Sequence, residues 1–184
     1  MKHYVIATQR EWGVKVFKRL RIPSTSFVLY DDTAHTWTEQ LLAAMLAMDV
    51  PRYVFFLNWS SRVPLEVLEM SPIVEAVNFH CTSLPYGRGG GPIENLILRG
   101  HTETVITAHR MTDVIDGGPI YGTRGPVSLA GTKEQILERF IEPCVALIRW
   151  IIETEPESYP QVGPVVAFKR LPRAEFENFW KERV

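Results

Sequence analysis

The sequence predicts an α/β fold in which a mostly parallel sheet carries helices on both faces. Short apolar runs of strand length alternate along the chain with segments whose apolar residues recur at helical spacing, which is the pattern of such sheets. The chain has 184 residues, of which 46% are hydrophobic and 22% are charged. A chain of this size and composition is expected to form one globular domain, or one domain with an appendage, and to bury a core without disulfides or metal ions.

The first half of the chain shows the alternation most clearly. Residues 3–7, 26–30 and 53–57 are apolar runs of the kind found in buried strands, while 14–20 and 37–48 have helical periodicity. The turn at residues 8–13 lacks the glycine-rich fingerprint of dinucleotide binding. Residues 64–70 are predicted as a short helix that leads back to another apolar strand at 73–79.

In the second half, local signals mark where the helices begin. A Pro/Gly-rich loop follows the strand at 73–79, and Pro92 then opens a helix to residue 99, because proline is favoured at a first helical position. Residues 104–111 alternate as a strand does, and 119–129 are extended. Thr132 caps a long amphipathic helix, which Pro143 is expected to kink. We therefore expect a main domain at residues 1–155, followed at 156–184 by a polar, proline-rich linker and a short amphipathic extension.

Three polar residues stand where this fold places ligand sites. Asn78 and His80 are two apart at the end of a predicted strand, so both side chains point to the same side. Open α/β sheets bind ligands at the carboxyl ends of their strands. Asp116 lies in a turn between two apolar runs. Alone, each residue is more often structural, but together they supply the amide, imidazole and carboxylate that acyl transfer with proton shuttling needs.

These residues belong to a longer motif that resembles a known family. Asn-x-His at Asn78, then Thr82, Leu-Pro, Arg-Gly and Pro92, with Asp-x-Gly at Asp116, is similar to the folate-dependent formyltransferases, most of all their amino-sugar N-formyltransferase branch. The resemblance covers residues 1–155 and implies a Rossmann-like fold. Ser83 and Gly87 depart from the family pattern, which leaves open the shape of the loop on its substrate side.

The resemblance implies transfer of a formyl group from 10-formyltetrahydrofolate to a primary amine. Asn78 and a protonated His80 are expected to stabilise the formyl oxygen, while Asp116 is expected to raise the pKa of His80 above its usual range and to accept a proton. The donor is expected to contact Trp59, Ser60, Ser61, Arg62, Val63, Pro64, Thr112, Asp113, Val114 and Ile115. The acceptor is expected to contact Gln9, Arg10, Ser83, Arg88, Gly89 and Gly90.

The expected acceptor is a small-molecule amine, an amino sugar or a sugar nucleotide. Trp59-Ser60 and residues 168–172 resemble the amino-sugar branch, and we expect the separate C-terminal domain of tRNA formyltransferases to be missing, because no sequence remains for it after these residues. The net charge of −1 shows no electrostatic footprint for nucleic acid. Glycinamide ribonucleotide or methionyl-tRNA formylation, formyltetrahydrofolate hydrolysis and non-catalytic folate binding stay open as alternatives.

The remaining motifs predict an ordinary cytoplasmic protein without a membrane partner. Two cysteines make no disulfide framework, and there is neither a signal peptide nor an apolar run long enough to span a bilayer. His101 and His109 lie far in sequence from any cluster with ligand spacing, so we expect them to be solvated or structural and predict no metal. The oligomeric state stays open, with a homodimer among the alternatives.

Overall fold

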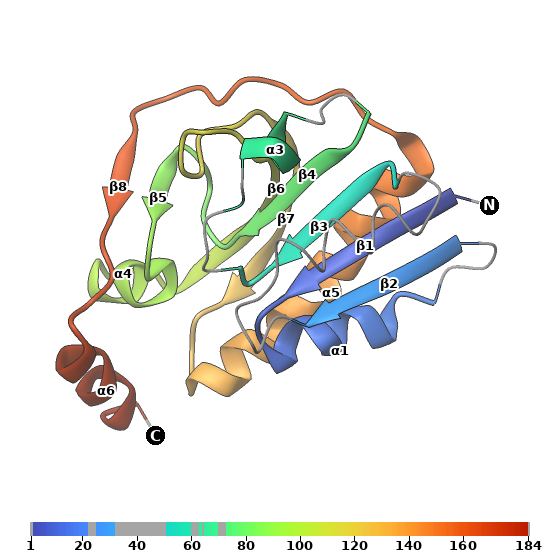
Figure 1. The fold of residues 1–184 in the computed structure, drawn as a ribbon. Coiled ribbons are helices and arrows are strands. Elements are labelled where there is room, and N and C mark those ends of the chain that lie inside the picture. Colours follow the sequence, from blue (N-terminus) through green and yellow to red (C-terminus); the bar gives the residue numbers. More distant parts are fainter. Residues whose placement is uncertain are drawn as a thin grey trace.

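The computed structural model describes residues 2–21, 25–31, 51–59, 63, 65–69 and 73–183. A six-stranded sheet of order β2-β1-β3-β4-β6-β7 crosses the molecule (Figure 1). Its strands are β1 (Lys2–Thr8), β2 (Thr25–Asp31), β3 (Tyr53–Leu57), β4 (Glu75–His80), β6 (Glu103–Arg110) and β7 (Ile120–Ser128). The first four are parallel, whereas β6 and β7 are antiparallel to their neighbours, so the predicted mostly parallel α/β fold is confirmed.

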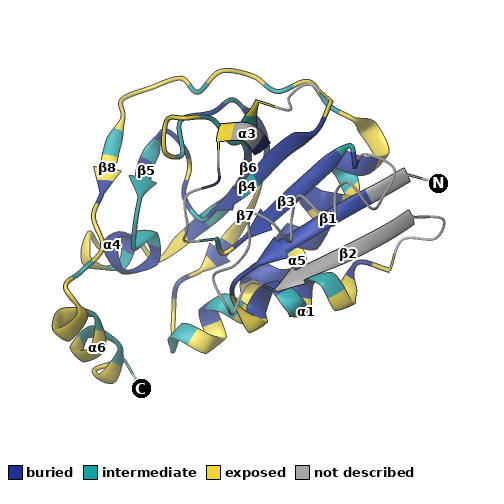
Figure 2. Ribbon diagram, viewed as in Figure 1, coloured by how far each residue is buried: buried dark blue, intermediate teal, exposed yellow. Residues whose placement is uncertain are grey.

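The sheet buries a separate core on each face. Along β1, Tyr4 and Ile6 point into the larger core, while Val5 and Ala7 point into a smaller one, as the two-residue period of a strand requires. Helices α1 (Glu11–Arg19) and α5 (Lys133–Thr154) cover the larger core, and α3 (Leu65–Leu68) lies against the smaller one. Figure 2 shows the described central strands buried along their length, which explains their continuous apolar runs.

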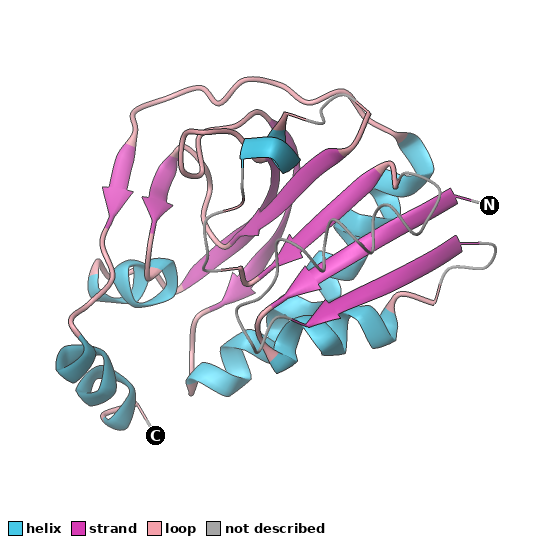
Figure 3. Ribbon diagram, in the orientation of Figure 1, coloured by secondary structure: helices cyan, strands magenta, loops and turns pink. Residues whose placement is uncertain are grey.

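The described helices begin where local signals predict. Pro92 starts α4 (Pro92–Leu98), and Thr132 forms a capping box with Gln135 at the start of α5. α5 continues through Pro143 (Figure 3), since its many buried apolar residues outweigh one lost backbone hydrogen bond. The helix expected at residues 37–48 lies outside the described residues. No helix in the described part of the chain is long and apolar enough to cross a membrane.

The main departure from expectation lies in the Pro/Gly-rich loop after β4. This loop contains a strand, β5 (Tyr86–Gly89), which pairs in parallel with β8 (Val166–Phe168) from the segment after α5, residues 156–183, which we call the tail. Neither segment alternates enough to be predicted alone, because each is a strand only through the other. The tail then ends in α6 (Arg173–Lys181), whose Trp180 donates a hydrogen bond to Glu94 of α4. The tail therefore lies against the segment that follows the candidate site (Figure 1).

Candidate active site

Asp116 is the point at which the predicted catalytic residues meet. Asn78 Nδ2 donates to Asp116 Oδ1 over 3.3 Å, and His80 Nδ1 lies 3.7 Å from Asp116 Oδ2. The backbone N–H of Gly89, on β5, donates to Asp116 Oδ2 over 2.8 Å. Two residues at the end of β4, the loop strand β5 and the β6–β7 turn are thus joined through one carboxylate.

A second histidine, His109, also belongs to this site, which corrects our expectation that it lies apart from any carboxylate. β6 runs antiparallel beside β4 with His109 opposite Asn78. The ring is buried, with its Nε2 3.5 Å from Asp116 Oδ1 and 3.2 Å from Asn78 Nδ2. Sequence reasoning missed His109 because only the register between β4 and β6 brings it to Asn78. His101, in contrast, is exposed.

The environment of His80 fixes how its ring is used. Its Nε2 lies 2.7 Å from the Gly87 carbonyl oxygen; since a carbonyl only accepts, Nε2 carries the hydrogen, and Nδ1 of the neutral ring is an acceptor facing Asp116. Burial lowers the pKa of His80 below 6.5, although Asp116 and the Gly87 carbonyl both act to raise it. The expectation that Asp116 lifts this pKa above its usual range was therefore wrong, because desolvation outweighs the attraction.

The Asp116 carboxyl is held in its charged form. Burial acts to raise its pKa, but the hydrogen bond with His109, the nearby His80 and the Gly89 N–H together lower it from 3.8 to about 2. An acid this strong stays ionised across the neutral range and is a poor proton acceptor. A carboxylate held in this form can stabilise positive charge on a neighbouring ring.

The two segments predicted to contact a formyl donor are brought to one side of the sheet. Trp59 and Val63 join the smaller core, and Met111, beside the second segment, packs on the same core. Val114 and Ile115 of that segment are 54% and 65% exposed, so an apolar surface lies on the turn that carries Asp116. These features suit a flat heterocycle whose polar edges meet backbone groups. Ser60, Ser61, Arg62 and Pro64 lie outside the described residues.

The residues predicted to contact an acceptor are spread over three places. Gln9 and Arg10 stand at the end of β1, where Thr8 Oγ1 bonds the Arg10 backbone. Ser83 is exposed and lines a cavity of about 280 Å³ beside α4 and β6. The third place holds Arg88, Gly89 and Gly90, on and directly after β5, and it lies nearest to Asp116. The two glycines let another chain segment approach closely, but the tail, not an empty site, occupies that position. A Cβ at Gly89 would lie 2.5 Å from the Phe168 carbonyl oxygen, and one at Gly90 would lie 2.5 Å from Arg170 Cγ.

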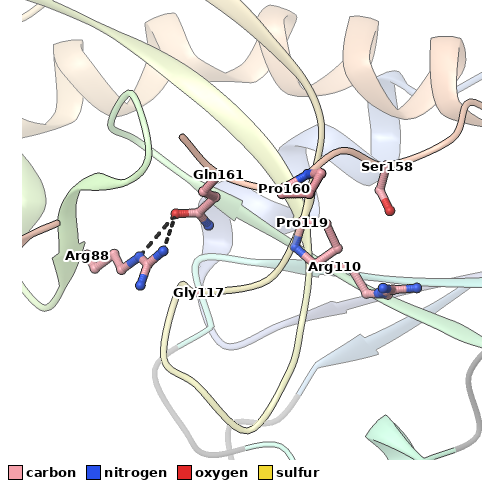
Figure 4. A pocket seen from close by; sticks show the side chains of 7 residues that line it. All are labelled: Arg88, Arg110, Gly117, Pro119, Ser158, Pro160 and Gln161. Atoms are coloured by element: carbon pink, nitrogen blue, oxygen red, sulfur yellow. Dashed lines mark hydrogen bonds between the residues drawn. The ribbon is translucent and has the colours of Figure 1, made fainter. Parts of the chain in front are cut away.

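Arg88 and a tail residue that sequence reasoning missed, Gln161, line the cavity beside Asp116. The cavity has a volume of about 440 Å³, and its lining residues are labelled in Figure 4. Gln161 Oε1 accepts hydrogen bonds from Arg88 Nε and Nη2 at 3.0 and 2.7 Å, which supports a bracing role for this arginine. A lone glutamine in a polar linker carries no sequence signal for such a role.

Two other features bear on the chemistry. Burial raises the pKa of the Cys81 thiol to about 12, so this neighbour of His80 is neutral and a poor nucleophile. Within the described ranges, no group of three or more His, Cys, Asp or Glu side chains is arranged to hold a metal ion.

A family model described as formyl transferase matches residues 4–149 of the chain. Among curated proteins, the methionyl-tRNA formyltransferase of Thermobifida fusca (strain YX) is 28% identical over 168 residues, which are 86% of this chain and 47% of that protein. The chain spans about half or less of the length of the curated relatives that it matches.

Solved structures of similar proteins share the fold. A methionyl-tRNA formyltransferase from Clostridium thermocellum superposes with a TM-score of 0.84 at 28% identity, over 95% of this chain and 75% of that one. WlaRD, a sugar 3N-formyl transferase solved in the presence of dTDP and 5-N-formyl-THF, has a TM-score of 0.63 at 18% identity, over 92% of this chain and 70% of that one. At 18% identity the similarity concerns the fold alone.

Proposed function

Because the chain belongs to the formyl transferase family, we propose that it moves a formyl group from 10-formyltetrahydrofolate to a primary amine. The observation that carries the proposal is the meeting of Asn78, His80 and Asp116 through one carboxylate. All three residues lie in the part of the chain that the family model matches. The resemblance seen in their motif is thereby confirmed at the level of the family.

Trp59 and the turn at residues 112–115 are the proposed place of the donor, with Val63 buried beneath them in the smaller core. The apolar residues there would cover the rings, and the backbone of the turn would meet their polar edges. When bound there, 10-formyltetrahydrofolate supplies an activated formyl group. The structure of WlaRD, which has a similar fold and was solved in the presence of 5-N-formyl-THF, supports this choice of donor.

In this proposal His80 accepts a proton rather than donating one at the start. The amine loses a proton as its nitrogen bonds to the formyl carbon. The unprotonated Nδ1 of His80 takes it, and the charged Asp116, 3.7 Å away, stabilises the imidazolium that results. As the bond between the formyl carbon and the folate nitrogen breaks, the imidazolium would return this proton to that nitrogen, so that tetrahydrofolate leaves and His80 is neutral again. The low pKa of Asp116 supports this division, since the carboxylate stays ionised throughout.

Asn78 is the proposed donor to the formyl oxygen. Its Nδ2 contacts with His109 and Asp116, at 3.2 and 3.3 Å, lie at and just beyond the long end of the usual hydrogen-bond range. Exchange of one of them for a developing negative charge is therefore favourable, and one preorganised donor of this kind lowers a barrier by roughly 3–4 kcal/mol.

The proposed acceptor is an amino sugar, either free or linked to a nucleotide. The net charge of −1 supports a small acceptor over a polyanion, and the fold similarity to a sugar 3N-formyl transferase agrees with it. A second candidate is methionyl-tRNA, because the curated relatives and a structure at 28% identity carry that name.

One assay tests both the formyl transfer and the choice of acceptor. The protein is incubated with 10-formyltetrahydrofolate and either amino sugars, amino-sugar nucleotides, methionyl-tRNA or glycinamide ribonucleotide, and tetrahydrofolate release is compared with product mass. We expect a formylated sugar as the fastest product. Faster formylation of methionyl-tRNA would replace the acceptor, formate release with no formylated product would indicate a hydrolase, and no consumption of the donor would refute the activity.

A further inference from the structure

The side chain of Gln161 joins two parts of the candidate site. Its Oε1 accepts from Arg88 Nε and Nη2 at 3.0 and 2.7 Å (Figure 4). Its Nε2 donates to the backbone carbonyl oxygens of Asp116 and Gly118 at 2.8 and 2.7 Å. Gln161 comes from the tail and lies 73 residues from Arg88 in sequence.

These four bonds use the whole hydrogen-bonding capacity of the amide. A guanidinium only donates and a carbonyl only accepts, so the amide has one orientation that satisfies every partner. No side-chain N–H of Gln161 is left for a ligand, which assigns this side chain to holding its neighbours rather than to binding substrate. Loss of a buried or half-buried partner in such a network is costly, because the other groups are left unsatisfied.

The outer side of the turn that Gln161 holds has few anchors. Asp113, Val114 and Ile115 are exposed, so little side-chain packing fixes the turn from that side. Asp116 itself has φ 49°, in the left-handed region, where a residue other than glycine is strained by roughly 1–3 kcal/mol. A strained residue keeps its place only when neighbouring contacts hold it, and two of the contacts on this turn come from Gln161.

Arg88 connects the same amide to β5. Its neighbour Gly89 donates to the Asp116 carboxylate over 2.8 Å. The carboxylate is thus tied to β5 through its side chain, and the backbone of the same residue is tied to β5 through Gln161 and Arg88. The two ties together set both the position and the direction of Asp116.

We propose that Gln161 is a positioning residue that holds Asp116 against His80 for formyl transfer. The inference rests on the proposed function for its catalytic part only. The geometric part, that Gln161 fixes the Asp116 carboxylate on Gly89, applies whatever reaction the site performs.

The test uses Gln161→Met, which keeps the length and removes all four bonds, in the full chain. Amide hydrogen exchange is followed residue by residue, with amides of β1 as the reference for global opening. We expect the Gly89 amide to exchange at least about tenfold faster than in the wild type, while β1 amides are unchanged. The matched control is Gln135→Met, which removes the partner of the α5 cap on the surface and should leave Gly89 protected.

Turnover is measured on the same variants with the formyl donor. A misplaced Asp116 should lower kcat by about tenfold or more, with KM for the donor within about threefold. Gln161→Glu keeps the bonds to Arg88 but turns an oxygen toward two carbonyls, and it should lose as much. If Gln161→Met does not fold, Gln161→Asn, which is too short to reach both sides, takes its place.

The outcomes separate the two claims. Wild-type protection of Gly89 in a folded variant would overturn the positioning role. Faster exchange at Gly89 with unchanged kcat would overturn its importance for catalysis. If the wild type transfers no formyl group at all, the proposed function fails, and the exchange data alone decide the geometric part.

Discussion

At the scale of single residues, the candidate site depends on the charge of one carboxylate and the neutrality of one ring. Asp116 receives contacts from β4, β5 and β6, and these hold its pKa at about 2. His80 is buried and its pKa is lowered. A charged acid beside a neutral base is the pair that a proton-accepting site needs before the reaction starts.

Asp116 should make the protein sensitive to acid. Its pKa falls from 3.8, the ordinary value of an aspartate, to about 2 in the fold, so the charged form stabilises the fold above about pH 4, and this contribution is lost as the pH falls through 2. The shift corresponds to about 2 kcal/mol. Between pH 4 and pH 2, the wild type should lose about that much more unfolding free energy than Asp116→Asn in urea titrations. Asp113→Asn, at an exposed position of the same turn, controls for net charge; equal losses in all three proteins would contradict the pKa.

His80 should titrate below its usual range. Because burial lowers its pKa, NMR of the ring protons should give a midpoint below 6.5, with the signal assigned by its absence in His80→Gln. The charged ring is disfavoured in the fold, so this residue makes stability fall as the pH drops below 6.5. His80→Gln should lower kcat by roughly 10²–10⁴. A midpoint above 6.5 would instead support a cationic His80 that donates to the formyl oxygen.

At the scale of elements, the pairing of β5 with β8 decides how close the tail lies to the site. The glycines of β5 allow this contact: Gly89 has φ 101° and no space for a Cβ next to Phe168. The strand is short and irregular, with a register shift between Tyr86 and Arg88. Its stability comes from partners outside it rather than from its own sequence.

Gly89→Ala should separate the two strands. The new Cβ would lie 2.5 Å from the Phe168 carbonyl oxygen, so β8 or β5 must move, and we expect this shift to weaken the bond from the Gly89 N–H to Asp116. Gly100→Ala is the matched control, because Gly100 also has a positive φ, of 82°, but has nothing within 4 Å of its Cβ position. We expect the control to lose about 1 kcal/mol of stability and Gly89→Ala to lose about 2 kcal/mol more, with turnover reduced only in the latter. If both variants lose the same unfolding free energy in urea, β8 moves away from the new Cβ at no cost in stability.

What could be predicted from the sequence follows the range of the signals involved. Apolar runs and helix starts such as Pro92 and Thr132 act within a few residues, so β1, β3, α4 and α5 were found close to their true bounds. β5 and β8 were missed because their partners are distant in sequence. His109 and Gln161 were missed for the same reason, since each joins the site only through tertiary contact. The predicted shift of the His80 pKa had the wrong direction, because the burial of the ring cannot be read from its neighbours in sequence.

At the scale of the whole molecule, the tail shares the core of the main sheet. Phe168 is 4% exposed and belongs to the larger core. Its ring meets Tyr86 edge-on, and the Arg99 guanidinium lies over it, 4.5 Å from the ring centre. We therefore expect removal of this side chain to destabilise the entire fold.

Phe168→Ala should lower the unfolding free energy by about 3–5 kcal/mol in a single cooperative transition. Val162→Ala is the control in the same tail; Val162 is 88% exposed, and its loss should change stability by less than about 0.5 kcal/mol. Urea unfolding followed by tryptophan fluorescence measures both. An unchanged midpoint in Phe168→Ala would mean that the tail folds as a unit separate from the sheet.

The pairing of β5 with β8 also sets an order of events during synthesis. The nascent chain emerges from the ribosome with its N-terminus first. Asn78, His80 and Asp116 therefore emerge well before Gln161 and Phe168. The sheet can begin to fold while translation continues, but the turn that carries Asp116 then lacks its brace. The candidate site is therefore completed only after residues 161–168 have left the exit tunnel, and a sheet that forms earlier also lacks the side chain of Phe168 in its larger core.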